Sequence, residues 1–134
     1  MKNKFLSFLL VVSILSSIII AFPTSASAAY YTMTNWKLAY TISGGEVTIT
    51  GYTTTSSPHT LEIPAKISGY PVTKIGDSAF ANCDSLLFLT FPNSIKHIGQ
   101  SAFEGCDNLY EITGTPNLEY IGDYAFYECK YLTA

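Results

Sequence analysis

The residues best suited to metal binding or disulfide chemistry are three cysteines, Cys83, Cys106 and Cys129, which recur every 23 residues. A structural zinc site needs four ligands at short spacings such as C-x-x-C, and this chain has no such spacing. Cysteines stacked on neighbouring strands would have Cα atoms about 4.8 Å apart. Their parallel side chains would nevertheless keep the Cβ atoms farther apart than the ~3.8 Å of a disulfide. We therefore expect buried free thiols, no metal and no cofactor.

The histidines and carboxylates offer no recognisable catalytic arrangement. His59 lies in a polar loop and His97 precedes an Ile-Gly pair, and catalysis would need a nucleophile and an orienting carboxylate beside one of them. The motifs G-x-S-x-G, H-E-x-x-H and the glycine-rich phosphate loop do not occur. The carboxylates show no repeated pairing of the glycosidase kind. The sequence predicts a protein that is not an enzyme.

The cysteines belong to a 23-residue repeat that organises the second half of the chain. Each copy reads Ile-Gly-x-x-Ala-Phe-x-x-Cys-x-x-Leu and begins at Ile75, Ile98 or Ile121. A fixed period in the twenties is typical of a solenoid, in which each repeat forms one coil stacked on the last. The recurring apolar residues are expected to form the core: Ile75, Phe80, Cys83, Leu86, Leu89, Ile98, Phe103, Cys106, Leu109, Ile112, Ile121, Phe126, Cys129 and Leu132.

Three other columns of the repeat predict local structure. Alanine beside phenylalanine indicates a short helical turn with little free space. The glycine column predicts a corner that needs a permissive backbone. Asp77 and Asp123 follow two of these glycines, and their carboxylates are expected to cap N–H groups of the turn.

This combination of columns resembles the BspA-type leucine-rich repeat. The resemblance covers residues 61–134, divided into a cap-like first coil (61–74), two full repeats (75–97 and 98–120) and a partial one (121–134). It implies a leucine-rich-repeat solenoid, β-rich with short helical turns. It also implies a secreted or surface protein of bacteria that acts in adhesion or protein binding, with a host matrix or cell-surface protein as its partner.

Residues 29–60 are expected to cover the first coil of the stack. The stretch from Trp36 to Tyr52 alternates apolar and polar residues around Gly44-Gly45, a pair that suits the positive φ angles of a type I′ turn. We predict a β-hairpin with one apolar face, formed by Leu38, Tyr40, Ile42, Val47 and Ile49. Such a cap is needed because the end of a stack otherwise exposes core side chains and unpaired backbone.

Residues 1–28 have the layout of a secretory signal peptide. A basic start leads into a mostly apolar stretch that ends at Phe22, and Ala26-Ser27-Ala28 suits signal peptidase, with cleavage near Ala28-Ala29. An uncleaved anchor is the competing interpretation, because about 18 apolar residues can span a bilayer. The A-x-A motif favours cleavage. We expect a secreted, extracellular or cell-surface protein that meets the membrane only through this peptide.

The charge balance argues against nucleic-acid binding. Without Lys2 and Lys4 of the leader, five lysines face ten acids, so the remainder carries a net charge of −5 and has no arginine. Such a chain has no basic patch to neutralise phosphates.

The strand face of the solenoid is the predicted binding surface. Side chains between the core columns must point outward, and the candidate residues on this face are Leu87, Phe88, Thr90, Tyr110, Glu111 and Thr113. An exposed strip of phenylalanine and tyrosine resembles the aromatic enrichment of protein interfaces. The alternative is a purely structural role, in which these aromatics only cover neighbouring coils.

Two other functions remain open at this point. The chain could be a carbohydrate-binding module of the cell envelope, with tyrosines and Trp36 as stacking platforms for sugars. It could also be a truncated N-terminal piece of a larger surface protein with only a structural role. Whatever the function, an uncovered terminal strand of the last coil is expected to pair with a neighbour or to aggregate, so self-association at that end is expected.

Overall fold

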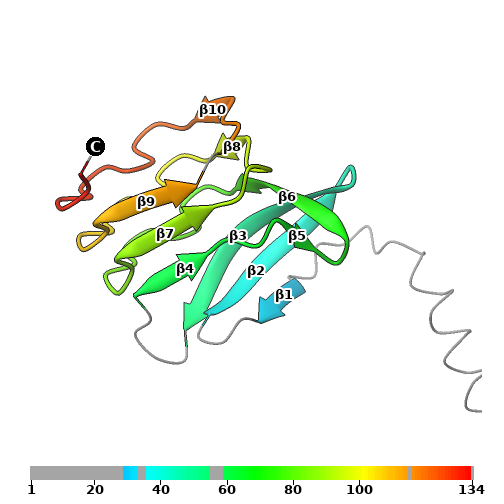
Figure 1. Cartoon of the computed structure of the whole chain (residues 1–134), viewed down its shortest axis with the longest axis horizontal. Coiled ribbons are helices and arrows are strands. Elements are labelled where there is room, and N and C mark those ends of the chain that lie inside the picture. Colours follow the sequence, from blue (N-terminus) through cyan, green and yellow to red (C-terminus); the bar gives the residue numbers. More distant parts are fainter. Residues whose placement is uncertain (1–28, 33–35, 55–58, 115, 134) are drawn as a thin grey trace, which may run out of the picture.

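The computed structural model describes residues 29–32, 36–54, 59–114 and 116–133. A sheet of seven strands and a sheet of three strands form two sides of a stack of coils (Figure 1). The strands are β1 (Ala29–Thr32), β2 (Trp36–Ser43), β3 (Glu46–Thr54), β4 (Thr60–Glu62), β5 (Lys66–Ile67), β6 (Tyr70–Ile75), β7 (Phe88–Phe91), β8 (His97–Ile98), β9 (Glu111–Gly114) and β10 (Tyr120–Ile121). The predicted signal peptide lies outside the described residues, and within them no helix is long and apolar enough to cross a membrane.

The predicted hairpin is present as β2 and β3, which pair in antiparallel fashion through a turn at Gly44 (φ 59°) and Gly45 (φ 78°). Leu38, Tyr40, Val47 and Ile49 on its apolar face are buried. Ile42 is 39% exposed, contrary to the prediction. It lies two residues before Gly44, at the turn end of β2, although its cross-strand partner Val47 is buried. β1, which the sequence analysis did not predict, extends the hairpin by pairing antiparallel to β2.

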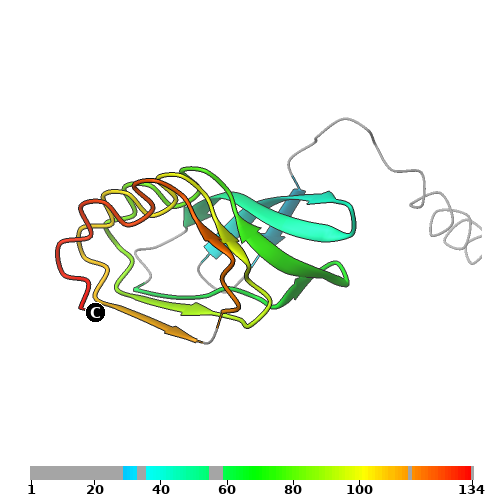
Figure 2. The ribbon, with the colours of Figure 1, turned by 90° about the horizontal axis from the view of Figure 1, so that it is seen from above.

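The 23-residue period appears in the structure as two ladders of parallel strands. Ile75 of β6 pairs with Ile98 of β8, and Ile98 pairs with Ile121 of β10. On the second side β7 and β9 pair in parallel at the same offset of 23 residues, whereas Thr60 of β4 pairs in parallel with Phe88 of β7, which is 28 residues later. The hairpin continues the first ladder, because Ile49 of β3 pairs in parallel with Ile75. The cap is therefore hydrogen-bonded into the stack, and Figure 2 shows the coils side by side next to it.

The third side of the stack consists of successive tight turns, and the described residues contain no helix. The N–H of Ala79 bonds to the carbonyl of Gly76 at 3.3 Å, but positive φ angles at Ser78 (53°) and Asn82 (58°) interrupt any helical run. Other N–H groups point to the next coil, such as that of Phe80, which donates to the carbonyl of Ala102 at 2.8 Å. The short helical turn expected here is replaced by turns that bond from coil to coil.

Aromatic rings stack through the centre of the coils. The rings of Phe80 and Phe103 are parallel within 1° at 5.2 Å, and those of Phe103 and Phe126 repeat this geometry at 5.3 Å. Each ring is thus covered by its copy in the next coil, which is what the 23-residue repeat of phenylalanine predicts.

The hairpin supplies the first ring of this column. Tyr52 stacks on Phe80 at 5.4 Å with an interplanar angle of 15°, so it takes the position that a phenylalanine of a preceding coil would have. Trp36 packs against Tyr52 at 5.4 Å, and its Nε1 donates a hydrogen bond to the carbonyl of Thr60 at 2.9 Å. Burial and a hydrogen bond with Cys83 raise the pKa of Tyr52 well above its usual range. The hairpin therefore covers the first coil and also provides a ring in the position that the repeat gives to phenylalanine.

The glycine column is required by close packing more than by backbone angle. A Cβ at Gly99 would lie 2.6 Å from the backbone nitrogen of Asp77, and one at Gly122 would lie 2.5 Å from that of Gln100. Neither glycine has a positive φ, so the prediction of an unusual backbone corner is wrong here. The Asp77 carboxylate also acts differently from the prediction, because it accepts the N–H of Gln100 in the next coil at 2.9 Å.

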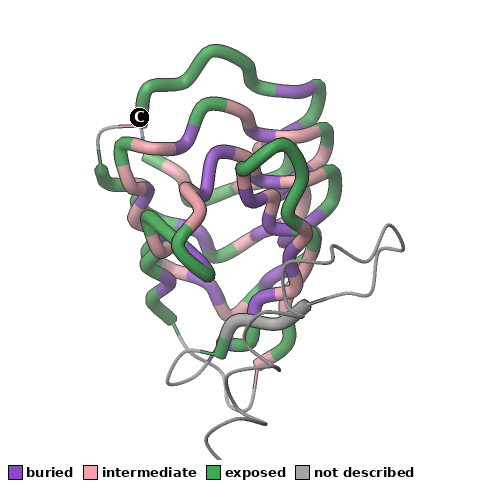
Figure 3. The backbone as a smooth tube through the Cα atoms, turned by 90° about the vertical axis from the view of Figure 1, so that its right-hand side faces the viewer, coloured by how far each residue is buried: buried purple, intermediate pink, exposed green. Residues whose placement is uncertain are grey.

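Burial of the predicted core declines toward the last coil. The core positions of the first two repeats, from Ile75 to Leu109, are fully buried. Ile121, however, is 51% exposed. Four further predicted core residues are only half-buried: Ile112, Phe126, Cys129 and Leu132. Phe126, Cys129 and Leu132 lie on the last coil, which no other described coil covers, and Ile112 lies on β9, the edge strand of the three-stranded sheet. Figure 3 shows the last coil exposed over most of its length.

Candidate functional site

The outer face of the three-stranded sheet is a regular array of side chains. Leu61, Leu89 and Ile112 pair across the strands and point to the core. The residues on either side of them must therefore point outward, because successive side chains of a strand alternate. Two outward rows result: Thr60, Phe88 and Glu111 in one, and Glu62, Thr90 and Thr113 in the other. We call these two rows, together with Leu87 and Tyr110 at the strand entrances, the strand face.

The aromatic residues of the strand face lie together. Phe88 is 40% exposed and Tyr110 is 51% exposed. Their rings meet edge to face, with centroids 6.3 Å apart and an interplanar angle of 76°. Leu87 beside them is half-buried. This contact leaves apolar surface open to solvent while fixing the orientation of both rings.

The polar residues of the strand face lie beside the aromatic pair on the same strands and are also in regular contact. The hydroxyls of Thr90 and Thr113 are hydrogen-bonded at 2.9 Å. Glu111 is exposed next to Phe88 in the register of the sheet. The structure thus brings all six predicted binding residues onto one continuous surface, with the aromatic pair at one end and the threonine pair at the other.

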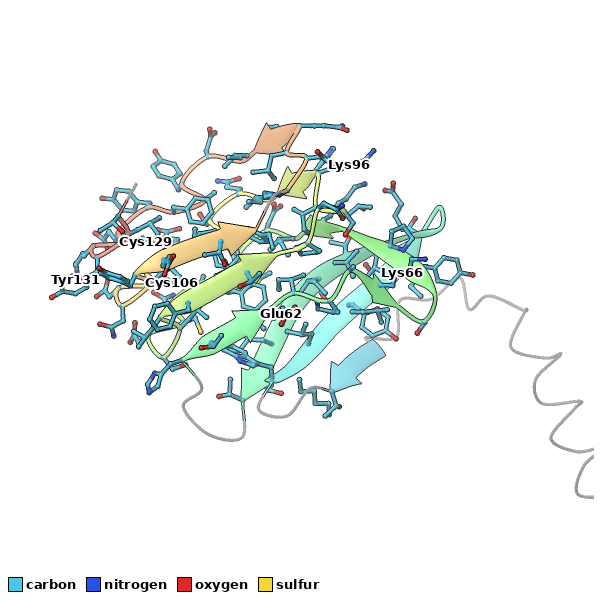
Figure 4. The ribbon with its side chains drawn as sticks, in the orientation of Figure 1. Glu62, Lys66, Lys96, Cys106, Cys129 and Tyr131 are labelled. Atoms are coloured by element: carbon cyan, nitrogen blue, oxygen red, sulfur yellow. The ribbon has the colours of Figure 1, made fainter. Side chains whose placement is uncertain are left out.

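Sequence reasoning missed one part of this surface. A shallow hollow of about 260 Å³ lies where β4 and β7 end, and it is lined by Glu62, Ile63, Pro64, Ala65, Thr90, Phe91 and Pro92. Glu62 is labelled at this place in Figure 4. A signal for it exists in the sequence, because Leu61-Glu62-Ile63-Pro64 has the same order of strand and closing proline as Leu89-Thr90-Phe91-Pro92. Applying the alternation of inward and outward side chains to Leu61-Glu62-Ile63, as for Leu89-Thr90-Phe91, would have added Glu62 to the candidate residues.

The charge on the strand face is entirely acidic. β4, β7 and β9 contain two glutamates and no lysine. Three lysines are held elsewhere by carboxylates: Lys74 by Glu46 at 3.6 Å, Lys96 by Glu119 at 3.4 Å, and Lys130 by Asp107 at 2.8 Å. Glu62 and Glu111 take part in none of the ion pairs found among the described residues. Their carboxylates face solvent together with the aromatic pair.

The cysteines form a ladder of hydrogen bonds, and all three thiols are free, as predicted. The thiol of Cys106 donates to the carbonyl of Phe80 at 3.1 Å, and that of Cys129 donates to the carbonyl of Phe103 at 3.2 Å. Burial raises the pKa of the Cys106 thiol to about 12 and also raises the pKa of Cys129. Because the thiolate is the reactive form, these thiols are suited to packing and not to nucleophilic attack.

The remaining candidates for chemistry are scattered over the molecule. His59 is exposed, with its Nδ1 at 3.2 Å from the carbonyl oxygen of Ser85, and the Nε2 of His97 lies 3.9 Å from a carboxylate oxygen of Glu119. In the part of the chain that the structure describes, no group of three or more histidine, cysteine or acidic side chains could hold a metal ion. Trp36 is only 3% exposed, so the suggestion that it stacks on a sugar is wrong.

Comparison with known proteins gives a consistent set of relatives. Residues 52–134 match the family described as a BspA-type leucine-rich repeat region, so the match begins at the tyrosine that starts the aromatic column. Comparison with curated proteins gave no match.

Three solved structures illustrate the likeness. A leucine-rich repeat protein from T. pallidum is 33% identical, with a TM-score of 0.66, over 71% of this chain and 44% of its own. A leucine-rich cell surface protein from Faecalibacterium prausnitzii is 32% identical, with a TM-score of 0.67, over 82% and 31% of the two chains. A leucine-rich repeat protein from Bacteroides capillosus is 30% identical, with a TM-score of 0.65, over 78% of both. The chain thus spans less than half the length of the first two.

Proposed function

The chain belongs to the BspA-type leucine-rich repeat family, and we propose that it is a non-enzymatic module that binds another protein through its strand face. The observation that carries this proposal is the exposed contact between Phe88 and Tyr110 on an ordered sheet. Aromatic side chains contribute a large contact area at low entropic cost, and they dominate the binding energy of many protein interfaces. Proteins of this repeat family are generally not enzymes.

We further propose that this binding takes place outside the bacterial cell or on its surface and serves adhesion. Support comes from the family and from the cell surface protein of Faecalibacterium prausnitzii, which shares 32% of its aligned residues with this chain. The sequence of residues 1–28 has the features of a signal peptide. The partner proposed on these grounds is an extracellular protein, either of a host matrix or of a cell surface.

The test is a binding measurement against a panel of purified matrix proteins, fibronectin among them, by surface plasmon resonance. Phe88→Ala should weaken the binding of any partner found by at least about 10-fold, because truncating a central aromatic residue costs about 2 kcal/mol or more. Tyr131→Ala is the matched control, since Tyr131 is 62% exposed but lies outside the strand face. Partner binding that is the same for wild type and Phe88→Ala would contradict the proposed surface.

A further inference from the structure

We propose that the strand face recognises an extended basic segment of its protein partner. One lysine or arginine side chain of the segment enters the hollow beside Glu62, and a second pairs with Glu111. The inference rests on the proposed function, because it concerns the same surface, and it adds the chemistry of the partner. It is carried by the shape of the hollow, the charge of the face and the spacing of the two carboxylates.

The hollow suits one long basic side chain. Pro64, Ala65 and Pro92 give it apolar walls, and Glu62 provides a carboxylate at its edge. Lysine and arginine combine an apolar stem with a cationic end, so the stem can pack on the prolines while the end reaches the carboxylate. A volume of about 260 Å³ lies below the range of about 300–1,000 Å³ that small-molecule sites occupy. A single side chain is therefore a better occupant than a cofactor or drug-sized ligand.

The charge of the face favours a cationic partner. Glu62 and Glu111 are exposed and lack ion-pair partners in the described part of the chain. The nearest lysine along the chain, Lys66, belongs to β5, which pairs with β6 and not with β4. In Figure 4 it lies to one side of Glu62. A partner with lysine or arginine therefore meets an uncompensated negative surface, which favours correct pairing over encounter with acidic proteins.

The spacing of the two glutamates defines the pattern that the segment should carry. Glu62 and Glu111 are two strands apart and differ by two positions in register. With strands about 4.8 Å apart and a rise of about 3.3 Å per residue, their Cα atoms are about 12 Å apart. Residues i and i+4 of an extended chain are separated by about 13 Å and point to the same side. The line between the glutamates crosses β7 at the register of Leu89, between the outward side chains of Phe88 and Thr90. Residue i+2 of the segment should be apolar, so that it can pack on the exposed ring of Phe88.

The test uses fluorescence anisotropy with a fluorescein-labelled peptide that contains Lys-Thr-Val-Thr-Lys, together with a peptide in which both lysines are glutamine. We expect the lysine peptide to bind and the glutamine peptide to bind at least about 10-fold more weakly. The variant Glu62→Gln/Glu111→Gln should lose about 10-fold in affinity for the lysine peptide. The matched control, Glu104→Gln/Glu128→Gln, makes the same change of net charge in the turns of the third side and should bind like wild type.

Two results would overturn the inference. Equal weakening by the two double variants would mean that net charge alone attracts the peptide, and equal binding of the lysine and glutamine peptides would mean that the carboxylates do not select the ligand. Failure here is distinguishable from failure of the proposed function. If a matrix protein binds in a manner that depends on Phe88 but not on Glu62 and Glu111, the strand face remains the binding surface and the basic segment is rejected.

Discussion

Replacing Tyr52 with alanine should weaken the whole fold, because this residue connects the hairpin to the repeats. Its ring covers Phe80 at 5.4 Å on one side and contacts Trp36 at 5.4 Å on another. Truncating a fully buried aromatic residue costs about 3–5 kcal/mol. Tyr52 is half-buried, so we expect Tyr52→Ala to lower the free energy of unfolding by about 2 kcal/mol. In a domain of this size that corresponds to a fall in Tm of about 8–16 °C.

The assay is thermal unfolding followed by circular dichroism, with two variants for comparison. Tyr52→Phe keeps the stacked ring and loses only the hydroxyl that bonds with Cys83, so it should cost about 0.5–1.5 kcal/mol. Tyr131→Ala removes an exposed tyrosine of the last coil and should cost less than about 0.5 kcal/mol. A Tm for Tyr52→Ala within the range of the Tyr131→Ala control would refute the idea that the hairpin supplies the first ring of the aromatic column.

Two further variants test the packing between coils. Gly99→Ala should lower the free energy of unfolding, measured in urea, by about 1–3 kcal/mol, because the added Cβ has no space beside Asp77. Gly51→Ala should lower it by less than about 0.5 kcal/mol, because the nearest neighbour of an added Cβ is 4.0 Å away. Similar losses for the two variants would contradict the close-packing explanation. Burial raises the pKa of Cys106 from its ordinary value near 9 to about 12, so the unfolded chain releases this proton at lower pH than the folded chain, and stability should decline from about pH 9 upward. Cys106→Ala should remove part of that decline in urea titrations at increasing pH, and an unchanged slope would contradict this assignment.

The architecture was predictable from the sequence wherever a residue type recurs in phase. The columns at Ile75, Phe80 and Cys83 recur without slippage, and parallel pairing then places each copy against the next. The hairpin was predictable for a similar reason, since alternation and Gly44-Gly45 are local signals. What was missed depends on contacts that no local pattern encodes. The stacking of Tyr52 on Phe80 joins residues with no shared motif, and the exposure of Ile121 depends on what covers the last coil.

The sequence was enough to predict which side chains of the candidate site face outward, but not the shape of the surface that they form. Alternation along β7 was enough to assign Phe88 and Thr90 to the outer face. The hollow beside Glu62 required the placement of β4. Its coil differs from the others by the turn at Ser68-Gly69, so it does not share the 23-residue period on which the other assignments were based.

The 23-residue offset between contacting residues of the repeats also determines how the protein would respond to a pulling force. The Thr90–Thr113 and Asp77–Gln100 contacts each span 23 residues, so a coil is held by its immediate neighbours alone. A pulling force on the last coil would act on the parallel strand pairs from that end, so the hydrogen bonds between coils would break one coil at a time. Each coil of 23 residues would release about 80 Å of extended chain. The period that sets the register of the strands therefore also sets the step length with which the solenoid would unravel.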